Sequence, residues 1–258
     1  MKKLLVVATG LVVLAAAGVV LTQSAEAAAE PAYHPARLAH VEDARQLVVV
    51  TGVSKTSTHA TLRTYRKNAD GTWSEQFAAM PARLGYGGWV EAAKRVQDTG
   101  TTPQGTFRIT TAFGLGANPG TKLPYRLADS DDYWVGDQKD PRTYNLFQKS
   151  ASAKRTWRTG EAEKLAGYPT QYEHVAVIDF NRPRPANVMW HAYYSEYVTS
   201  APANVKLGSA IFLHVNGAGS TAGCVSVARA GMISVLNWLD PALKPRIVMA
   251  PEAEIGKA

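Results

Sequence analysis

The chain has 258 residues, a formal net charge of +7 and a single cysteine, Cys224. Because one cysteine cannot form an internal disulfide, the packing of the core must hold the fold together. The basic residues are scattered, with no run longer than pairs such as Lys94-Arg95, and the spacing of a zinc finger is absent. This distribution argues against nucleic acid as a partner, whereas a basic surface favours attraction to anionic polymers.

The first 29 residues have the succession of residue types that is typical of a secretory signal peptide. Lys2 and Lys3 precede an apolar run over 4–21, and small residues follow over 24–29. This order predicts cleavage after Ala29 and an exported protein. A membrane anchor is the alternative, because the apolar run is nearly long enough to span a bilayer, but the small residues favour cleavage. Charged residues interrupt every later apolar stretch, which predicts no membrane span after cleavage.

A segment without sustained periodicity over 30–45 predicts a short tether, and one domain is expected over 46–258. Short apolar or alternating runs, typical of strands, recur along this domain. They cover residues 47–50, 60–65, 107–109, 175–178, 211–213 and 247–249. Residues 115–165 have little periodicity and many aromatic and charged side chains. This composition predicts a long surface excursion, of the kind that often carries function.

One segment near the end has the spacing of a helix. Four apolar side chains share one face over residues 232–239, and Pro241 ends the predicted helix. Because the other periodic segments are strand-like, the sequence predicts a mainly β fold. We expect a single domain of the β-sandwich or mixed-sheet type, with one helix that follows Cys224.

The most informative stretch joins a histidine at the end of a predicted strand to the lone cysteine. A polar, Gly-rich loop separates His214 from Cys224, which stands ahead of the predicted helix. A free thiol has a pKa of about 8.5, and a neighbouring histidine can convert it to the reactive thiolate. The backbone N–H groups of Gly223 and Cys224 are candidate donors to the oxyanion of a tetrahedral intermediate. Spacing alone leaves a second reading open, in which both side chains are inert and packed.

The stretch over 208–224 resembles the histidine and the Ser/Thr-x-Gly-Cys signature of the L,D-transpeptidase catalytic domain, a family of bacterial cell-wall enzymes. Three other segments are similar to this family, over residues 102–107, 177–181 and 238–241, together with the pair Tyr144-Asn145. The Ala-Gly-Cys form of the signature, with Ala222, resembles one branch of it. The resemblance covers nearly the whole chain after residue 29 and implies the fold of that domain.

The resemblance also implies the roles of the site residues. Cys224 matches the nucleophile, His214 the residue that pairs with its thiol, and Gly223 the glycine that shapes the oxyanion site. The expected substrate contacts are Ser220, Thr221, Tyr144 and Asn145. In this family the thiolate attacks the third residue of a peptidoglycan tetrapeptide stem and expels the terminal D-alanine. An amine of another stem then resolves the thioester into a 3→3 cross-link, and no cofactor takes part.

Two departures from the family pattern leave alternatives open. The signature more often has histidine in place of Ala222, and arginine in place of Ser226. Both departures bear on the substrate contacts, and two other functions remain: an L,D-carboxypeptidase, in which water resolves the thioester, and a non-catalytic wall-binding module. A generic secreted cysteine protease ranks last, because the local cysteine signature of papain-like enzymes is missing. In each case we expect a secreted or wall-associated protein that meets stem peptides and anionic wall polymers.

Other polar residues are expected to be structural. His174 and His191 lie in or beside strand-like segments, which is typical of packed histidines. A structural zinc site needs about four ligands at short spacing, which one cysteine and scattered histidines do not supply, so we expect no metal. Four aspartates lack the regular pattern of a calcium loop and are expected to form a polar loop beside the substrate-binding groove of the predicted enzyme. They are Asp129, Asp131, Asp132 and Asp137.

Overall fold

The computed structural model describes residues 33–258, so the predicted signal peptide lies outside the described residues. Its strands are β1 (Gln46–Gly52), β2 (His59–Lys67), β3 (Trp73–Glu75), β4 (Met80–Arg83), β5 (Trp89–Glu91), β6 (Thr102–Gly114), β7 (Tyr125–Leu127), β8 (Asp132–Val135), β9 (Phe147–Lys149), β10 (Ala162–Lys164), β11 (Val175–Ile178), β12 (Val188–His191), β13 (Glu196–Thr199), β14 (Phe212–Val215), β15 (Val225–Val227) and β16 (Arg246–Pro251). The α-helix of the described residues is α1 (Arg229–Trp238). Short 3-10 helices are η1 (Pro35–Arg37), η2 (Ala92–Lys94), η3 (Thr159–Glu161), η4 (Leu165–Gly167), η5 (Pro185–Asn187), η6 (Pro241–Leu243) and η7 (Glu252–Lys257).

The main sheet is mixed and curls back on itself. Its strands follow the order β1-β16-β6-β11-β14-β15-β4-β2-β3, and β1 also pairs with β2, which closes the path. The pairs β1–β16 and β14–β15 are parallel, whereas β6 is antiparallel to both β16 and β11. The prediction of a mainly β domain with mixed sheets and one helix after Cys224 is therefore confirmed.

The closed sheet surrounds the largest apolar cluster. Side chains from most of its strands, among them Val48, Leu213 and Ile247, are fully buried there. The predicted helix face joins them, because Met232 and Val235 on α1 are also fully buried. Because side chains alternate along each strand, every second side chain points to the outer face of the sheet, away from this cluster. Two satellite clusters cover parts of that outer face.

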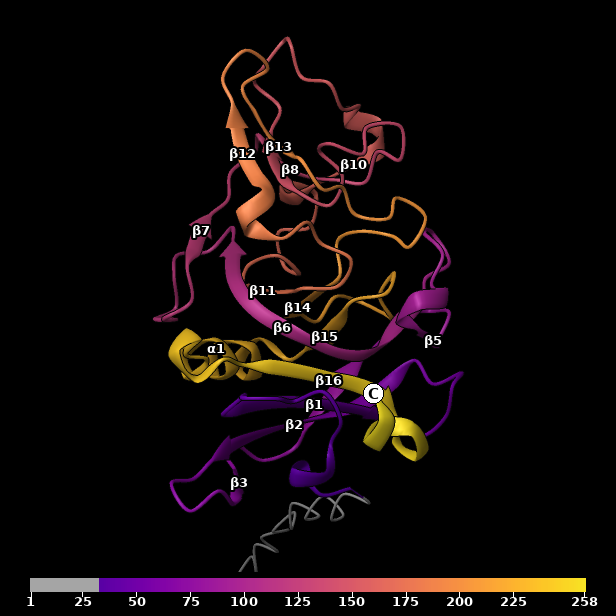
Figure 1. Cartoon of the computed structure of the whole chain (residues 1–258), viewed down its shortest axis with the longest axis vertical. Helices are drawn as coiled ribbons and strands as arrows, with labels where there is room; N and C mark the ends of the chain where they lie inside the picture. Colours follow the sequence, from indigo (N-terminus) through magenta and orange to yellow (C-terminus); the bar gives the residue numbers. More distant parts are fainter. Residues whose placement is uncertain (1–32) are drawn as a thin grey trace, which may run out of the picture.

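The excursion over 115–165 differs from a simple surface loop. It contains the small antiparallel sheet β10-β8-β9, and Figure 1 shows β8 and β10 beside β12 and β13 at one end of the molecule. Trp134 on β8 is buried against Phe113 and Phe212 of the main sheet. These strands have three or four residues each, too few for alternation to mark them in the sequence. The excursion therefore forms a cap over one patch of the outer face.

The described residues ahead of β1 pack against the domain. Leu38 and Ala44 are buried in one of the satellite clusters, together with side chains of β1 and β16. Glu42 forms an ion pair with Arg246 at 2.7 Å. Among the described residues no helix has the length and apolar character needed to cross a bilayer.

Candidate active site

The register of two strands brings the predicted cysteine and histidine together. In the parallel pair β14–β15, Leu213 lies opposite Val225 and His214 lies opposite Ser226. Cys224 directly precedes Val225 and therefore belongs to the set of side chains that includes His214, on the outer face. Leu213 and Val225 are fully buried on the inner face instead. The strand needs apolar residues on one side only, which explains why a histidine stands within an apolar run.

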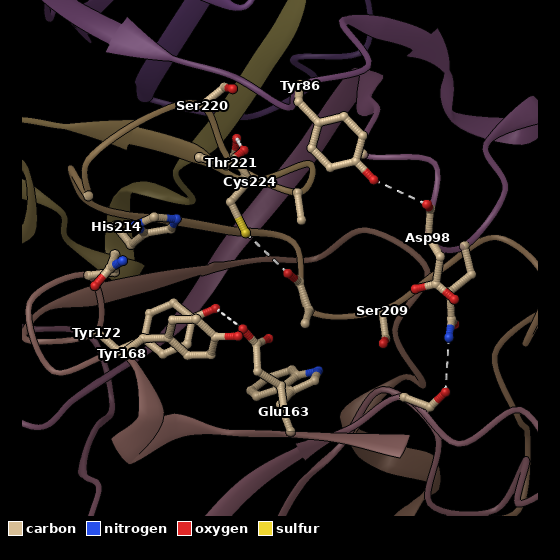
Figure 2. A pocket seen from close by; sticks show the side chains of 18 of the residues that line it. Tyr86, Asp98, Glu163, Tyr168, Tyr172, Ser209, His214, Ser220, Thr221 and Cys224 are labelled. Atoms are coloured by element: carbon tan, nitrogen blue, oxygen red, sulfur yellow. Dashed lines mark hydrogen bonds between the residues drawn. The ribbon is translucent and has the colours of Figure 1, made fainter. Parts of the chain in front are cut away.

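His214 and Cys224 open into a cavity of about 800 Å³ beneath the cap. Figure 2 shows both side chains turned into this space, with Tyr172 and Glu163 on the side away from Ser220. The walls come from distant parts of the chain, among them the loop before β6, the strands β8 and β10, the turn after η4, and the segments on either side of β14. A cavity of this kind, bordered by a thiol and an imidazole, is a candidate active site.

The sulfur of Cys224 is held in its neutral form. The side chain is 7% exposed, and its thiol donates to the carbonyl oxygen of Ala210 at 3.2 Å. Burial raises the pKa of Cys224 to about 12, and the nearby Glu163 carboxylate adds to the rise. The Phe212 N–H, which lies 3.4 Å from the sulfur, and the Arg95 guanidinium oppose this increase. At neutral pH the resting residue is therefore a thiol, not a preformed thiolate.

The imidazole of His214 is oriented by its own strand. Its Nδ1 lies 2.7 Å from the carbonyl oxygen of Val215, which can only accept, so Nδ1 carries the proton. This tautomer leaves Nε2 free to accept a proton. Burial lowers the pKa of His214 to about 4, and the hydrogen bond to Val215 opposes the shift. The ring packs edge-on against Tyr172, with 5.5 Å between the two ring centroids. The imidazole is therefore neutral at physiological pH.

The glycine before the cysteine is fixed by close contacts. Gly223 has φ = 134°, and a Cβ placed there would lie 2.8 Å from the carbonyl oxygen of Thr101 and 2.9 Å from Nη2 of Arg95. Its N–H donates to Oγ1 of Thr221 at 3.1 Å, and the Thr221 hydroxyl donates to the carbonyl of Cys224 at 2.6 Å. Of the two expected oxyanion donors, the Gly223 N–H is thus already engaged. No side chain among residues 33–258 accepts from the Cys224 N–H.

Replacing Gly223 by alanine is expected to lower the free energy of unfolding by about 2 kcal/mol, because the side chain would meet backbone at a strained φ. Acylation of Cys224 should slow as well. Urea unfolding checks the first effect, and Gly219→Ala is the matched control, since nothing lies within 4 Å of a Cβ there. Equal stability of the two variants would contradict the assignment of a packing constraint at Gly223.

Two of the expected substrate contacts lie behind the cavity. Ser220 and Thr221 line it, but Tyr144 and Asn145 are 0% and 1% exposed and do not. Asn145 adopts a left-handed conformation with φ = 59°. Its Oδ1 accepts from Trp134 Nε1 at 2.7 Å and from the Ala210 N–H at 3.2 Å. In this structure Asn145 therefore positions the segment whose carbonyl receives the thiol, and does not face a ligand.

Three side chains of the cavity were not singled out in the sequence. Glu163 and Tyr172 form a hydrogen bond of 2.5 Å within the cavity, and Arg95 lies beside Gly223. Arg95 is 3% exposed and donates to the carbonyl oxygens of Thr101 and Leu207, each at 2.8 Å. No spacing rule connects these residues to Cys224, because they reach it from distant parts of the chain.

The other polar candidates lie outside the cavity, and two of the aspartates have charged partners. Asp137 pairs with Arg158, and Asp132 is fully buried beside Lys149 at 3.2 Å. Neither aspartate lines the cavity, and nor do His174 and His191. Within the described part of the chain, no group of three His, Cys, Asp or Glu side chains is arranged to hold a metal ion.

The comparisons with known proteins agree with this geometry. The family model of the L,D-transpeptidase catalytic domain (YkuD) matches residues 48–248, a range that runs from β1 to β16 and includes His214 and Cys224. The chain matches no curated protein and no solved structure. Because the match spans most of the sequence and the fold is mainly β with mixed sheets, the chain belongs to the L,D-transpeptidase catalytic domain family.

Proposed function

We propose that the protein is a peptidoglycan L,D-transpeptidase in which Cys224 is the nucleophile. One observation supports this most: the register of β14 and β15 turns the thiol of Cys224 and the imidazole of His214 into one cavity. A thiol beside a neutral base is the pair that nucleophilic cysteine catalysis requires. The substrate class comes from the family, which acts on peptidoglycan.

Acylation begins when the thiol proton passes to Nε2 of His214 and the sulfur attacks the carbonyl of the third stem residue. The proposed donor to the oxyanion that forms is the Cys224 N–H. His214 then gives its proton to the departing amine of the terminal D-alanine, and a thioester on Cys224 remains. A side-chain amine of a second stem attacks that thioester. Its surplus proton returns through His214 to the sulfur, and a 3→3 cross-link is released.

Two alternatives share this site. Attack by water on the thioester would make the protein an L,D-carboxypeptidase, and loss of turnover would leave a wall-binding module. The departure at Ser226 does not alter the thiol and the imidazole, because Ser226 is fully buried and donates to Oδ1 of Asn216 at 2.8 Å. The Ser226 hydroxyl is thus engaged by Asn216 and not by the thiol. We further propose export, with the basic charge of the chain holding it near anionic wall polymers.

The test is a covalent adduct. Incubation of the purified protein with a tetrapeptide stem is expected to add the mass of the stem minus D-alanine, and a carbapenem is expected to add its own mass. Peptide mapping should place both on Cys224, and Cys224→Ala should carry neither. Product analysis separates the functions, since transfer gives dimers and hydrolysis gives tripeptides. Absence of any adduct on the wild-type protein would contradict the proposed nucleophile.

A further inference from the structure

A second titratable group faces the thiol and takes no proton in the acylation proposed above. Glu163 stands in the middle of β10, where it pairs with Trp134 of β8. Figure 2 shows its carboxylate turned into the same space as the sulfur of Cys224, on the side away from Ser220. The Tyr172 hydroxyl donates to Oε1 of Glu163 at 2.5 Å.

The charge of Glu163 is not neutralised by the protein. Among residues 33–258 no lysine, arginine or histidine lies within ion-pair distance of its carboxylate. Glu161, which lies two positions earlier and also borders the cavity, pairs with Arg158 at 3.4 Å. A carboxylate withdrawn from water without a cation is costly to keep ionised. The position is therefore suited to a cation that arrives with a ligand.

We propose that Glu163, held by Tyr172, binds the ammonium group of the acceptor peptide and removes one of its protons before the amine attacks the Cys224 thioester. This inference rests on the proposed function and names the residue that selects an amine over water. The ligand class is a primary ammonium on a flexible side chain of a second stem peptide.

The proton balance shows why one base is not enough. An acceptor amine reaches the site as R–NH₃⁺, whose nitrogen has no free electron pair. Transfer of one proton to the Glu163 carboxylate gives R–NH₂ and a neutral carboxylic acid. The nitrogen then forms the new bond to the thioester carbon and loses its second proton to Nε2 of His214. As the carbon–sulfur bond breaks, His214 returns that proton to the sulfur, and Glu163 releases its own to solvent.

The acidity of Glu163 suits this exchange. Burial raises its pKa to about 7, and the hydrogen bond from Tyr172 opposes the rise. The titratable groups that face it are the Tyr172 hydroxyl, from the turn after η4, and the Cys224 thiol, ahead of β15. Both are neutral at pH 7. A base with a pKa near the working pH is an efficient proton acceptor, and a bound ammonium would favour its charged form.

The experiment separates acylation from aminolysis. The protein is loaded with a tetrapeptide stem, and the thioester is then chased with a tripeptide stem that carries a free side-chain amine. For Glu163→Gln we expect acylation no slower than in wild type, because loss of the carboxylate charge lowers the pKa of the Cys224 thiol, but aminolysis slower by about 10²-fold, within the usual range for loss of a general base. Hydrolysis should persist, so the products shift from dimers to tripeptides. Glu161→Gln is the matched control and should leave this ratio unchanged.

A neutral nucleophile supplies the second readout. Hydroxylamine is uncharged at neutral pH and needs no initial deprotonation, so it should resolve the thioester equally fast in wild type and in Glu163→Gln. Glu163→Asp, which keeps a carboxylate, should recover part of the aminolysis. Aminolysis by Glu163→Gln at the wild-type rate, or an equal loss with hydroxylamine, would overturn the inference. A wild-type protein that is never acylated would overturn the proposed function, and this inference with it.

Discussion

Replacing Asn145 by alanine is expected to lower the free energy of unfolding by about 4 kcal/mol, the largest stability effect at the site. The change removes the acceptor of the Trp134 indole N–H and of the Ala210 N–H. It also removes the donor to the carbonyl oxygens of Phe180 and Asn181. Each buried group left without a partner costs about 1–3 kcal/mol, and a left-handed φ adds about 1–2 kcal/mol for alanine.

The same variant should lose activity, because the anchored segment holds the thiol. The carbonyl of Ala210 accepts from Cys224, and a displacement of about 1 Å near a reacting group can cost about 10²-fold. Urea unfolding and acylation followed by mass spectrometry measure the two effects. Asn237→Ala, at an exposed position of α1, should change stability by less than about 0.5 kcal/mol. If Asn145→Ala unfolds like Asn237→Ala, the proposed anchor is wrong.

Six strands of the main sheet, β1, β2, β6, β11, β14 and β16, could be predicted because they are buried on at least one face. Residues 175–178 are apolar throughout and correspond to β11, whereas residues 47–50 mark the middle of β1. Both are central to the sheet, so every position carries a packing constraint that composition reveals. The helix was predictable for the same reason, since its apolar face meets the core.

The cap could not be predicted in the same way. The strands β8, β9 and β10 exist because they pair with one another and cover Phe113 and Phe212, which are remote in the sequence. Local propensity has little influence on such short strands, and tertiary contact decides them. For this reason Glu163, on β10, gave no signal beside Cys224.

The residues of the candidate site likewise fall into those that the sequence could predict and those that it could not. His214 lies on β14 and Cys224 directly ahead of the neighbouring β15, with one loop between them, so their spacing in the sequence indicated that they meet. Their catalytic roles remain a prediction. Asn145 was expected to contact substrate, but the structure shows that its side chain forms hydrogen bonds with Trp134 and with the backbone. The sequence of a functional loop does not distinguish a polar residue that binds a ligand from one that stabilises the loop through hydrogen bonds.

Replacing His214 by glutamine is expected to slow acylation of Cys224 by about 10³-fold at neutral pH, within the usual range for loss of a general base. The pH dependence identifies the cause. The pKa of His214 is about 4, so its neutral, basic form dominates above that pH. The pKa of Cys224 is about 12, so the thiol remains protonated and available for transfer across the physiological range. Wild-type acylation should therefore be nearly flat between about pH 6 and pH 9.

The variant has no base and must react through the small fraction of free thiolate. At any pH below the thiol pKa, the thiolate fraction increases tenfold for each unit by which the pH is raised. The acylation rate of the variant should therefore increase with pH, and its difference from the wild-type rate should become smaller in alkali. The measurement is single-turnover acylation by a tetrapeptide stem, or by a carbapenem, across this pH range. His174→Gln changes a buried histidine that lies outside the cavity and should keep the flat profile. A His214 variant with a flat profile and a wild-type rate would show that another group removes the thiol proton, and the pairing proposed from the strand register would fail.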